Sequence, residues 1–261
     1  MKRLIVLAAG TGSRLGTLTD SKPKCLQTIS GKSILDWQID VARSQGMEEI
    51  VVVRGHLAQH IRVEGVKYVE NLEYAASNML YSLWCARAHL MGEVIVSYGD
   101  IIFSPQVFKS ISEAEEDMAI AIDLQWFSYW RQRFSDVLSD AESMELGEDG
   151  RIVSLGEKTR DLSRVQGQYI GLMKFSASGS ESICTYLEKE SSTMQSVVYG
   201  AAECSLKEAY MTDFLQHLIN NGHRLTPVFI EGGWLEIDHA SDLDLANELV
   251  HMEGGQFVIT R

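Results

Sequence analysis

Short apolar runs alternate with amphipathic stretches along much of the chain. Residues 4–9 are continuously apolar and end at a glycine, which is typical of a strand covered on both faces in a parallel sheet. Residues 33–44 carry apolar side chains at helical spacing. Further strands are predicted at residues 50–53, 67–70, 93–98, 118–124 and 226–230, and further helices at 77–90, 178–190, 211–221 and from 241 onward. Strands that alternate with helices predict an α/β fold with a doubly wound, mostly parallel sheet.

The middle of the chain has a different pattern. Residues 136–164 are polar and charged, with glycines at the predicted turns. Residues 151–155 and 166–175 alternate enough to be strands, which favours a smaller antiparallel addition. We therefore predict a single domain over residues 1–261 with a small lobe at about residues 125–175.

The composition limits the ligands that the protein can bind. The formal net charge is −13, so the surface as a whole does not attract nucleic acid or an anionic membrane, and a polyanionic ligand requires a local basic site. No apolar run approaches the roughly 20 residues of a membrane span, and the N-terminal run is too short for a signal peptide. The four cysteines lack metal-ligand spacing, which favours reduced thiols in a cytoplasmic protein. We expect a monomer or a homodimer.

The most informative segment follows the first predicted strand. It reads LAAGTGSRLG at residues 7–16 and continues to Lys22-Pro-Lys24. A strand that feeds a glycine-rich loop presents backbone N–H groups to a phosphate, and the cations add charge there. The spacing fits neither a dinucleotide fingerprint, where Leu15 replaces the third glycine, nor a P-loop, where Leu26 replaces the first. The structural alternative is a tight turn with incidental surface cations.

This segment resembles the signature of the sugar-nucleotidyltransferase family, whose members join a nucleoside monophosphate to a phosphorylated acceptor and release pyrophosphate. The resemblance implies a Rossmann-like sheet of the nucleotide-diphospho-sugar transferase type. It also implies that the loop amides of Gly10, Thr11 and Gly12 bind the triphosphate together with an arginine, which here is Arg14. Lys24 would stabilise the charge that develops during attack. Arg14 and Lys24 are therefore the expected catalytic residues.

Two aspartates are the expected ligands of a Mg²⁺ ion. Asp100 follows the apolar strand at 93–98, and ligands of open α/β sheets bind at the carboxyl ends of strands. Asp238 ends the segment WLEID (234–238), just before the last predicted helix. Magnesium usually sits on one or two carboxylates and on substrate phosphates, and the resemblance implies that this pair holds it. Taken singly, each aspartate could equally be a helix cap or a turn residue.

The segment 70–83, ENLEYAASNMLYSL, indicates the nucleotide. It resembles a segment of the phosphocholine cytidylyltransferase-like branch, in which these residues border the cytosine pocket. The alternative is structural, because Asn78 is well placed to cap a helix. CTP is therefore the expected nucleotide. The residues expected to bind it are Leu7, Ala8, Ala9, Gly10, Thr11, Gly12, Ser13, Arg14, Lys24, Glu70, Asn71, Ser77, Asn78, Met79, Ser82, Tyr98 and Gly99.

The acceptor is predicted from more scattered signals. Aromatic side chains at 126–130 could bind a quaternary ammonium group through cation–π attraction, although an aromatic packing cluster gives the same pattern. Asp136, Asp140 and Glu142 could balance a cationic acceptor or be solvated loop charges. Lys158 resembles the lysine of an E-K-P segment without the proline, and an exposed charge pair is the alternative. The residues expected around the acceptor, on the side of the mid-chain lobe, are Asp100, Trp126, Tyr129, Lys158, Tyr169, Trp234 and Glu236.

Together these patterns predict a cytidylyltransferase. The acceptor, a small phosphorylated or phosphonate compound, attacks the α-phosphorus of CTP, and the products are a CDP-linked compound and pyrophosphate. One alternative is a UTP- or dTTP-dependent sugar-1-phosphate nucleotidyltransferase. The others are a non-catalytic nucleotide-binding protein and a nicotinamide-dependent dehydrogenase, and Leu15 argues against the dehydrogenase.

Overall fold

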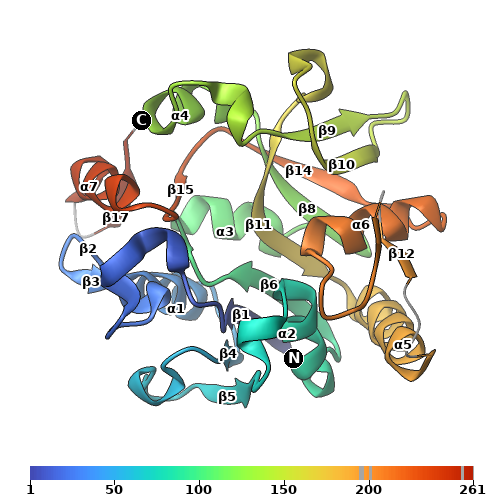
Figure 1. Cartoon of the computed structure of the whole chain (residues 1–261), viewed down its shortest axis with the longest axis horizontal. Helices are drawn as coiled ribbons and strands as arrows, with labels where there is room; N and C mark the ends of the chain where they lie inside the picture. Colours follow the sequence, from blue (N-terminus) through green and yellow to red (C-terminus); the bar gives the residue numbers. More distant parts are fainter. Residues whose placement is uncertain (194–196, 200–201, 254–255, 261) are drawn as a thin grey trace.

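A seven-stranded sheet runs through the computed structural model, which describes residues 1–193, 197–199, 202–253 and 256–260. The strand order is β14-β8-β11-β6-β1-β4-β5 (Figure 1). The strands are β1 (Lys2–Ala8), β4 (Glu49–Arg54), β5 (Lys67–Glu70), β6 (Glu93–Tyr98), β8 (Met118–Asp123), β11 (Gln168–Phe175) and β14 (Thr226–Ile230). Neighbouring strands are parallel except that β11 is antiparallel to both β6 and β8. The predicted Rossmann-like, doubly wound and mostly parallel sheet is confirmed.

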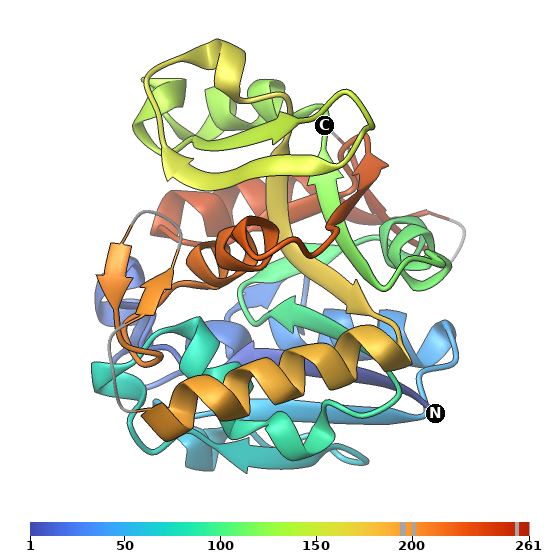
Figure 2. The ribbon, with the colours of Figure 1, turned by 90° about the vertical axis from the view of Figure 1, so that its right-hand side faces the viewer.

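Helices cover both faces of the sheet because its strands bury side chains on both sides. In β1, Leu4 and Val6 belong to one apolar core, whereas Ile5 and Leu7 belong to the other. Helices α1 and α3 contribute to the first core, and α2, α5 and α6 contribute to the second (Figures 1 and 2). The helices are α1 (Ile34–Ser44), α2 (Met79–Cys85), α3 (Pro105–Ser112), α4 (Trp126–Arg133), α5 (Ala177–Thr193), α6 (Met211–Asn220) and α7 (Ala240–Leu249).

Two predicted helices near the N-terminus differ in how well their limits agree with the structure. Helix α1 begins at Ile34, one residue after the predicted start, and the hydroxyl of Ser33 caps it by accepting a hydrogen bond from the N–H of Asp36 at 3.0 Å. The prediction of a helix at 77–90 is wrong in length, because α2 ends at Cys85 and only a 3₁₀ turn follows. Asn78 precedes α2 without capping it, and its side-chain amide instead donates to the carbonyl of Glu208.

The mid-chain lobe is smaller than predicted. Its strands β9 (Glu142–Leu146) and β10 (Ile152–Lys158) form an antiparallel hairpin, which lies with α4 at one end of the molecule (Figure 2). The strand predicted at 166–175 is not part of a separate addition, because β11 lies inside the central sheet. All of its side chains are buried, and its pairing with β8 is irregular between Tyr169 and Met173. Gly171, at φ +80°, lies within that bulge.

The remaining strands form short two-stranded pairs. The pair that matters for the site is β7 (Ile101–Phe103) with β15 (Trp234–Glu236). The others are β2 (Thr28–Ile29) with β3 (Lys32–Ser33), β12 (Val197–Tyr199) with β13 (Ala202–Cys204), and β16 (Val250–Glu253) with β17 (Gln256–Ile259). Among the described residues, no helix has both the length and the apolar character that crossing a membrane requires.

Replacing Gly171 by alanine should destabilise the fold for two separate reasons. Its φ is +80°, and an added Cβ would lie 2.5 Å from the ring of Tyr98. Gly31 is a matched control, because its φ is +83° but no heavy atom lies within 4 Å of an added Cβ. In urea unfolding, Gly31→Ala should lose about 1–2 kcal/mol through backbone strain, and Gly171→Ala about 1–3 kcal/mol more. Equal losses of stability in the two variants would contradict the predicted clash between the added Cβ and Tyr98.

Candidate active site

The carboxyl ends of β1 and β6 lie next to each other, because the two strands are parallel neighbours in the sheet. The N–H of Gly99 donates to the carbonyl of Leu7 at 2.9 Å, and a Cβ on Gly99 would lie only 2.7 Å from that oxygen. The glycine-rich loop after β1 and Asp100 after β6 therefore begin side by side. The N–H of His56 donates to the carbonyl of Ala9 at 3.0 Å and holds the start of the loop.

Asp238 is distant from Asp100 in sequence, and the short pair β7–β15 brings the two together. Strand β7 begins directly after Asp100, and β15 ends two residues before Asp238. In the antiparallel register Glu236 faces Ile101, and the N–H of Ile237 donates to the carbonyl of Asp100 at 2.9 Å. The two predicted metal ligands thus project from neighbouring backbone positions.

The two aspartates share one ammonium group. Lys24 Nζ donates to Asp100 Oδ2 at 2.8 Å and to Asp238 Oδ1 at 2.6 Å. Arg14 Nη2 lies 2.9 Å from the same oxygen of Asp238. The Asp238 side chain is 2% exposed and that of Lys24 is 13% exposed, whereas that of Arg14 is 57% exposed. Lys24 is therefore the inner cation of the cluster and Arg14 is an arm at its mouth.

Electrostatics favour the charged forms of Lys24 and Asp238. Burial alone would lower the pKa of Lys24, but the charges of Asp100 and Asp238 outweigh that effect and raise it. Burial likewise favours neutral Asp238, but Lys24 and then Arg14 lower the pKa of its carboxyl. Lys24 and Asp238 are consequently both charged over the physiological pH range.

The glycine loop packs directly against the stem of Lys24. Gly12 has φ +65°, and a Cβ there would lie 2.9 Å from the Lys24 Cβ. The hydroxyl of Thr19 donates to the carbonyls of Gly12 and Gly16, at 3.3 and 3.1 Å, and ties the loop down from below. Gly10 is exposed, and a Cβ on it would meet no heavy atom within 4 Å. The loop is thus fixed at its base and open at its tip, as a phosphate cradle requires.

A cavity of about 790 Å³ opens beside the cluster, between the sheet, the hairpin β9–β10 and α6. Ten of the residues predicted for the site line it: Ser13, Arg14, Asn78, Met79, Tyr98, Lys158, Tyr169, Trp234, Glu236 and Asp238. Trp130, Asp140 and Glu142, which the sequence also suggests for the acceptor, line it as well. The lining residues that sequence reasoning missed are Gly156, Gln168, Ile170, Gly171, Tyr210, Thr212 and Asp213. Most of these come from β10, β11 and α6, where no motif marks them.

Three predicted acceptor residues are not part of the cavity wall: Asp100, Trp126 and Tyr129. Asp100 lies in the adjoining cluster with Lys24, whereas Trp126 and Tyr129 are buried, at 4% and 1% exposed. They pack edge-to-face against Trp130, with ring centroids 6.1 and 5.5 Å from its own. Trp126 and Tyr129 therefore belong to an aromatic packing cluster, and the prediction that they form a cation–π cage for the acceptor is wrong. Trp130 and Trp234 are the members of the cluster that do border the cavity.

Twelve of the seventeen residues predicted to bind the nucleotide are not on the cavity wall. Eight of them are Leu7, Ala8, Ala9, Gly10, Thr11, Gly12, Lys24 and Gly99, and the other four are Glu70, Asn71, Ser77 and Ser82. The amide Nδ2 of Asn71, which is 1% exposed, donates to the hydroxyls of Ser77 and Ser82, both at 3.0 Å. Glu70 accepts from Arg54 Nε at 2.7 Å. These contacts hold residues on either side of Asn78 and Met79, which do line the cavity.

Carboxylates outnumber cations along the acceptor side of the cavity. Lys158 Nζ lies 3.4 Å from oxygens of both Asp140 and Glu142, so its charge is already compensated. Burial raises the pKa of Glu142, and Lys158 offsets only part of that effect. Asp213 adds a further carboxyl group to the wall. Glu236 also lines it, but burial and the charge of Asp238 raise the pKa of Glu236 to about 8, and its carboxyl group pairs with Arg133 at 2.7 Å. A ligand that enters this side therefore meets more carboxyl groups than cations.

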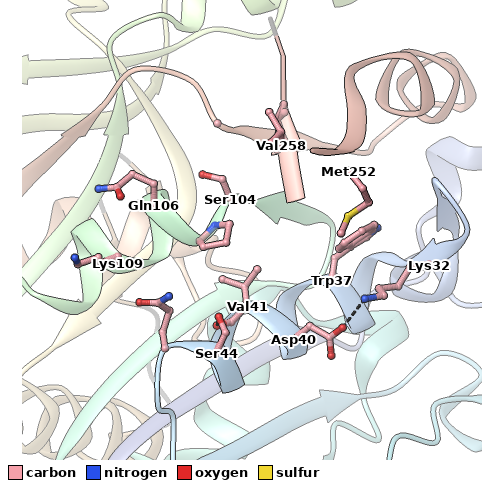
Figure 3. A pocket seen from close by; sticks show the side chains of 14 residues that line it. Lys32, Trp37, Asp40, Val41, Ser44, Ser104, Gln106, Lys109, Met252 and Val258 are labelled. Atoms are coloured by element: carbon pink, nitrogen blue, oxygen red, sulfur yellow. Dashed lines mark hydrogen bonds and ion pairs between the residues drawn. The ribbon is translucent and has the colours of Figure 1, made fainter. Parts of the chain in front are cut away.

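A separate hollow of about 730 Å³ contains none of the predicted site residues. It lies between α1, the start of α3 and the hairpin β16–β17, and Figure 3 shows the side chains around it. Lys32 pairs there with Asp40 and lies 4.4 Å from the ring centroid of Trp37. The ammonium group of Lys32 is therefore already paired. The glycine-rich loop and the two aspartates that share Lys24 are not among the residues that line this hollow.

A glycine-rich loop and a lysine shared by two aspartates that follow strands, on this fold, are the arrangement expected of a nucleotidyltransferase. The chain belongs to the family of proteins with a MobA-like NTP transferase domain, whose model matches residues 4–151. The predicted family resemblance and the prediction of an enzyme of this class are therefore confirmed, and the dehydrogenase alternative is set aside.

Several relatives act on CTP according to their names. The chain is 34% identical to the CTP:phosphoglutamine cytidylyltransferase of Campylobacter jejuni, over 94% of this chain and 98% of that protein. It is 26% identical to the 2-aminoethylphosphonate cytidylyltransferase of Lancefieldella rimae, over 70% of each. The structure of the CTP:phosphocholine cytidylyltransferase from Streptococcus pneumoniae superposes with a TM-score of 0.69 at 20% identity, covering 95% of this chain and 98% of that one, which supports the fold.

Removing the Lys24 charge should destabilise the protein in a pH-dependent way. In Lys24→Met two close carboxylates lose their cation, and breaking a buried ion pair in this way costs about 3–5 kcal/mol. The pKa of Asp238 is lowered from its ordinary value of 3.8, so its contribution to stability is fully present above that unfolded pKa and is lost as pH falls through the folded pKa. The gap between wild type and variant in urea unfolding should therefore be large at pH 7.5 and smaller at about pH 3.

Lys22→Met is the matched control for that measurement. Lys22 is the other lysine of the same segment, but its Nζ donates only to the hydroxyl of Thr28 among the described contacts. Its unfolding curve should follow that of wild type at both pH values. A Lys24→Met loss that does not depend on pH would contradict the electrostatic role of Lys24.

Proposed function

We propose that the protein transfers CMP from CTP to a small phosphorylated or phosphonate acceptor and releases pyrophosphate. The observation that carries this proposal is the cluster of Lys24, Asp100, Asp238 and Arg14 at the mouth of the glycine loop. Nucleotidyl transfer is mainly positioning and charge neutralisation, and this cluster offers both. The choice of CTP is supported by relatives named as cytidylyltransferases.

The proposed reaction assigns a task to each part of the site. Loop amides at Gly10–Gly12 and the exposed guanidinium of Arg14 bind the triphosphate. The acceptor oxyanion attacks the α-phosphorus in line, its oxygen forms the new P–O bond, and the bond to the leaving pyrophosphate breaks. Lys24 offsets the charge that builds up on the phosphoryl oxygens during this exchange. The nucleotide base is proposed to lie against Asn78 and Met79 on the cavity wall.

The residues at the site fit a magnesium ion. Asp100 Oδ1 is buried without a hydrogen-bond partner, which is an unmet demand for a cation or a donor. The described residues contain no cluster of three or more His, Cys, Asp or Glu that could hold a metal. Two carboxylates alone suit Mg²⁺, which takes its other ligands from water and substrate phosphates. Asp100 and Asp238 would hold the ion, which supplies neutralisation of the triphosphate charge.

Metal binding should depend on the nucleotide, because Lys24 Nζ lies between the two carboxylates in the free protein. We expect calorimetry to detect little Mn²⁺ binding to wild type alone and at least tenfold tighter binding with a non-hydrolysable CTP analogue. Lys24→Gln should bind Mn²⁺ without nucleotide, whereas the control Lys32→Gln should behave as wild type. Equal Mn²⁺ affinity of wild type with and without the analogue would refute this coupling.

The excess of carboxyl groups over cations on the acceptor side of the cavity supports an acceptor that carries an ammonium group. Asp140, Glu142 and Asp213 line this side, and Lys158 Nζ lies 3.4 Å from oxygens of the first two. A cationic group near the wall and a phosphoryl group near Lys24 satisfy both ends of the site.

We also propose that the enzyme works in the cytoplasm. The cytoplasm is a reducing compartment, which agrees with the four cysteines being free thiols.

A matrix of substrates tests the proposed function. CTP, UTP, dTTP and ATP are each combined with phosphoglutamine, 2-aminoethylphosphonate, phosphocholine and glucose 1-phosphate, and pyrophosphate release is measured with Mg²⁺. We expect activity with CTP and an ammonium-bearing acceptor. Lys24→Ala should lower kcat by about 10²–10³, and Lys32→Ala should not. Activity confined to UTP or dTTP with the sugar phosphate would overturn the proposal.

Glu142→Gln should weaken acceptor binding selectively. Loss of one carboxylate from the wall should raise the KM for an ammonium-bearing acceptor about tenfold, corresponding to about 1.4 kcal/mol. The KM for CTP should stay near that of wild type. Glu145→Gln is the control, because Glu145 lies on the same strand but pairs with Arg164 Nε at 2.7 Å outside the cavity wall. An unchanged acceptor KM in Glu142→Gln would contradict the assignment.

A further inference from the structure

Arg133, the last residue of α4, is a buried charge that the proposed reaction does not use. Its side chain is 0% exposed. The guanidinium Cζ lies 5.3, 5.2 and 5.0 Å from the ring centroids of Tyr129, Trp130 and Phe134. Burying an arginine among aromatic rings is costly unless its donors are satisfied. The structure satisfies them with carboxylates that belong to the candidate active site.

Three carboxylates face this guanidinium. Nη1 donates to Glu236 Oε2 at 2.7 Å, and Nε and Nη2 donate to the two oxygens of Asp242 at 3.0 and 3.1 Å. Nη2 also lies 3.7 Å from Asp238 Oδ2. The contact with Asp242 is bidentate, which fixes the plane of the guanidinium as well as its position.

Asp242 also holds the backbone of Asp238 in place. Its Oδ2 accepts from the N–H groups of Asp238 and His239, both at 2.8 Å. Arg133 therefore holds Asp238 in two ways, directly through Oδ2 and indirectly through the main chain. The other oxygen of Asp238, Oδ1, is left to Lys24 and Arg14. The two oxygens of one carboxylate thus have separate cationic partners on opposite sides.

We infer that Arg133 is a positioning residue for the metal-binding carboxylate of Asp238. This inference rests on the proposed function. Without the guanidinium, Glu236, Asp238 and Asp242 would repel one another in a buried site, and Asp238 would lose the contact that turns Oδ1 toward Lys24. Outer partners of this kind typically change metal affinity by about 10–100-fold when they are removed. Arg133 touches neither nucleotide nor acceptor in this assignment.

The test compares Arg133→Lys and Arg133→Met with wild type in the full chain. Lysine keeps the charge but loses the bidentate fork, and methionine loses both. Mn²⁺ affinity is measured by calorimetry with a non-hydrolysable CTP analogue present, below the unfolding temperature of each variant. We expect about 10-fold weaker Mn²⁺ binding for Arg133→Lys and about 100-fold for Arg133→Met. Raising Mg²⁺ should restore part of the lost rate in Arg133→Lys.

Two controls separate positioning from a purely structural role. Arg131→Lys and Arg131→Met change an exposed arginine of the same helix and should leave Mn²⁺ affinity unchanged. If neither Arg133 variant folds, Asp242→Asn decides, because it keeps the shape of the side chain but weakens the link to Arg133. Folded variants at position 133, or Asp242→Asn, that bind Mn²⁺ as wild type does would overturn the inference. A wild type that releases no pyrophosphate with any acceptor would instead reject the proposed function.

Discussion

The ammonium group of Lys24, placed between the carboxylates of Asp100 and Asp238, is the interaction on which the rest of the site depends. The side chain of Asp238 is 2% exposed and that of Asp100 is 21% exposed, so water weakens the repulsion between two carboxylates there only in part. The ammonium group offsets that repulsion and, despite burial, lowers the pKa of Asp238. It also joins three segments that are far apart in sequence: the loop after β1, the end of β6 and the end of β15. The fold brings Asp100 and Asp238 close together, and the positive charge of Lys24 offsets their negative charges.

The parts of the site that the sequence predicts are the residues that directly follow predicted strands. Residues 4–9 and 93–98 are apolar runs that stop at glycine or just before it, so the loop and Asp100 could be assigned to one edge of the sheet before any coordinates. What could not be predicted is how Asp238 reaches them. Strands β7 and β15 have three residues each, which is too short for a periodic pattern, and their pairing is a tertiary event.

Burial explains the two main misassignments. Aromatic composition is the same for a ligand cage and for a packed core, so Trp126 and Tyr129 could not be told apart from Trp130 by sequence. Strand β11 was misassigned because polar residues interrupt it. Lys174, which is 5% exposed, donates to the carbonyls of Ser112 and Ala114 at 2.7 Å each, so it caps the end of α3 from inside the protein. In the sequence pattern, a buried lysine of this kind cannot be distinguished from one that faces solvent.

The hairpin β9–β10 has a consequence for how this enzyme class can diversify. Lys24, Asp100 and Asp238 lie on segments that follow strands of the sheet and β15, whereas Asp140, Glu142 and Lys158 on the cavity wall belong to a projecting hairpin and the turn before it. A change of length or charge in that hairpin would alter one wall of the cavity and leave the contacts between the lysine and its aspartates in place. Under the proposed function, the choice of acceptor could therefore change while the residues proposed for transfer stay the same.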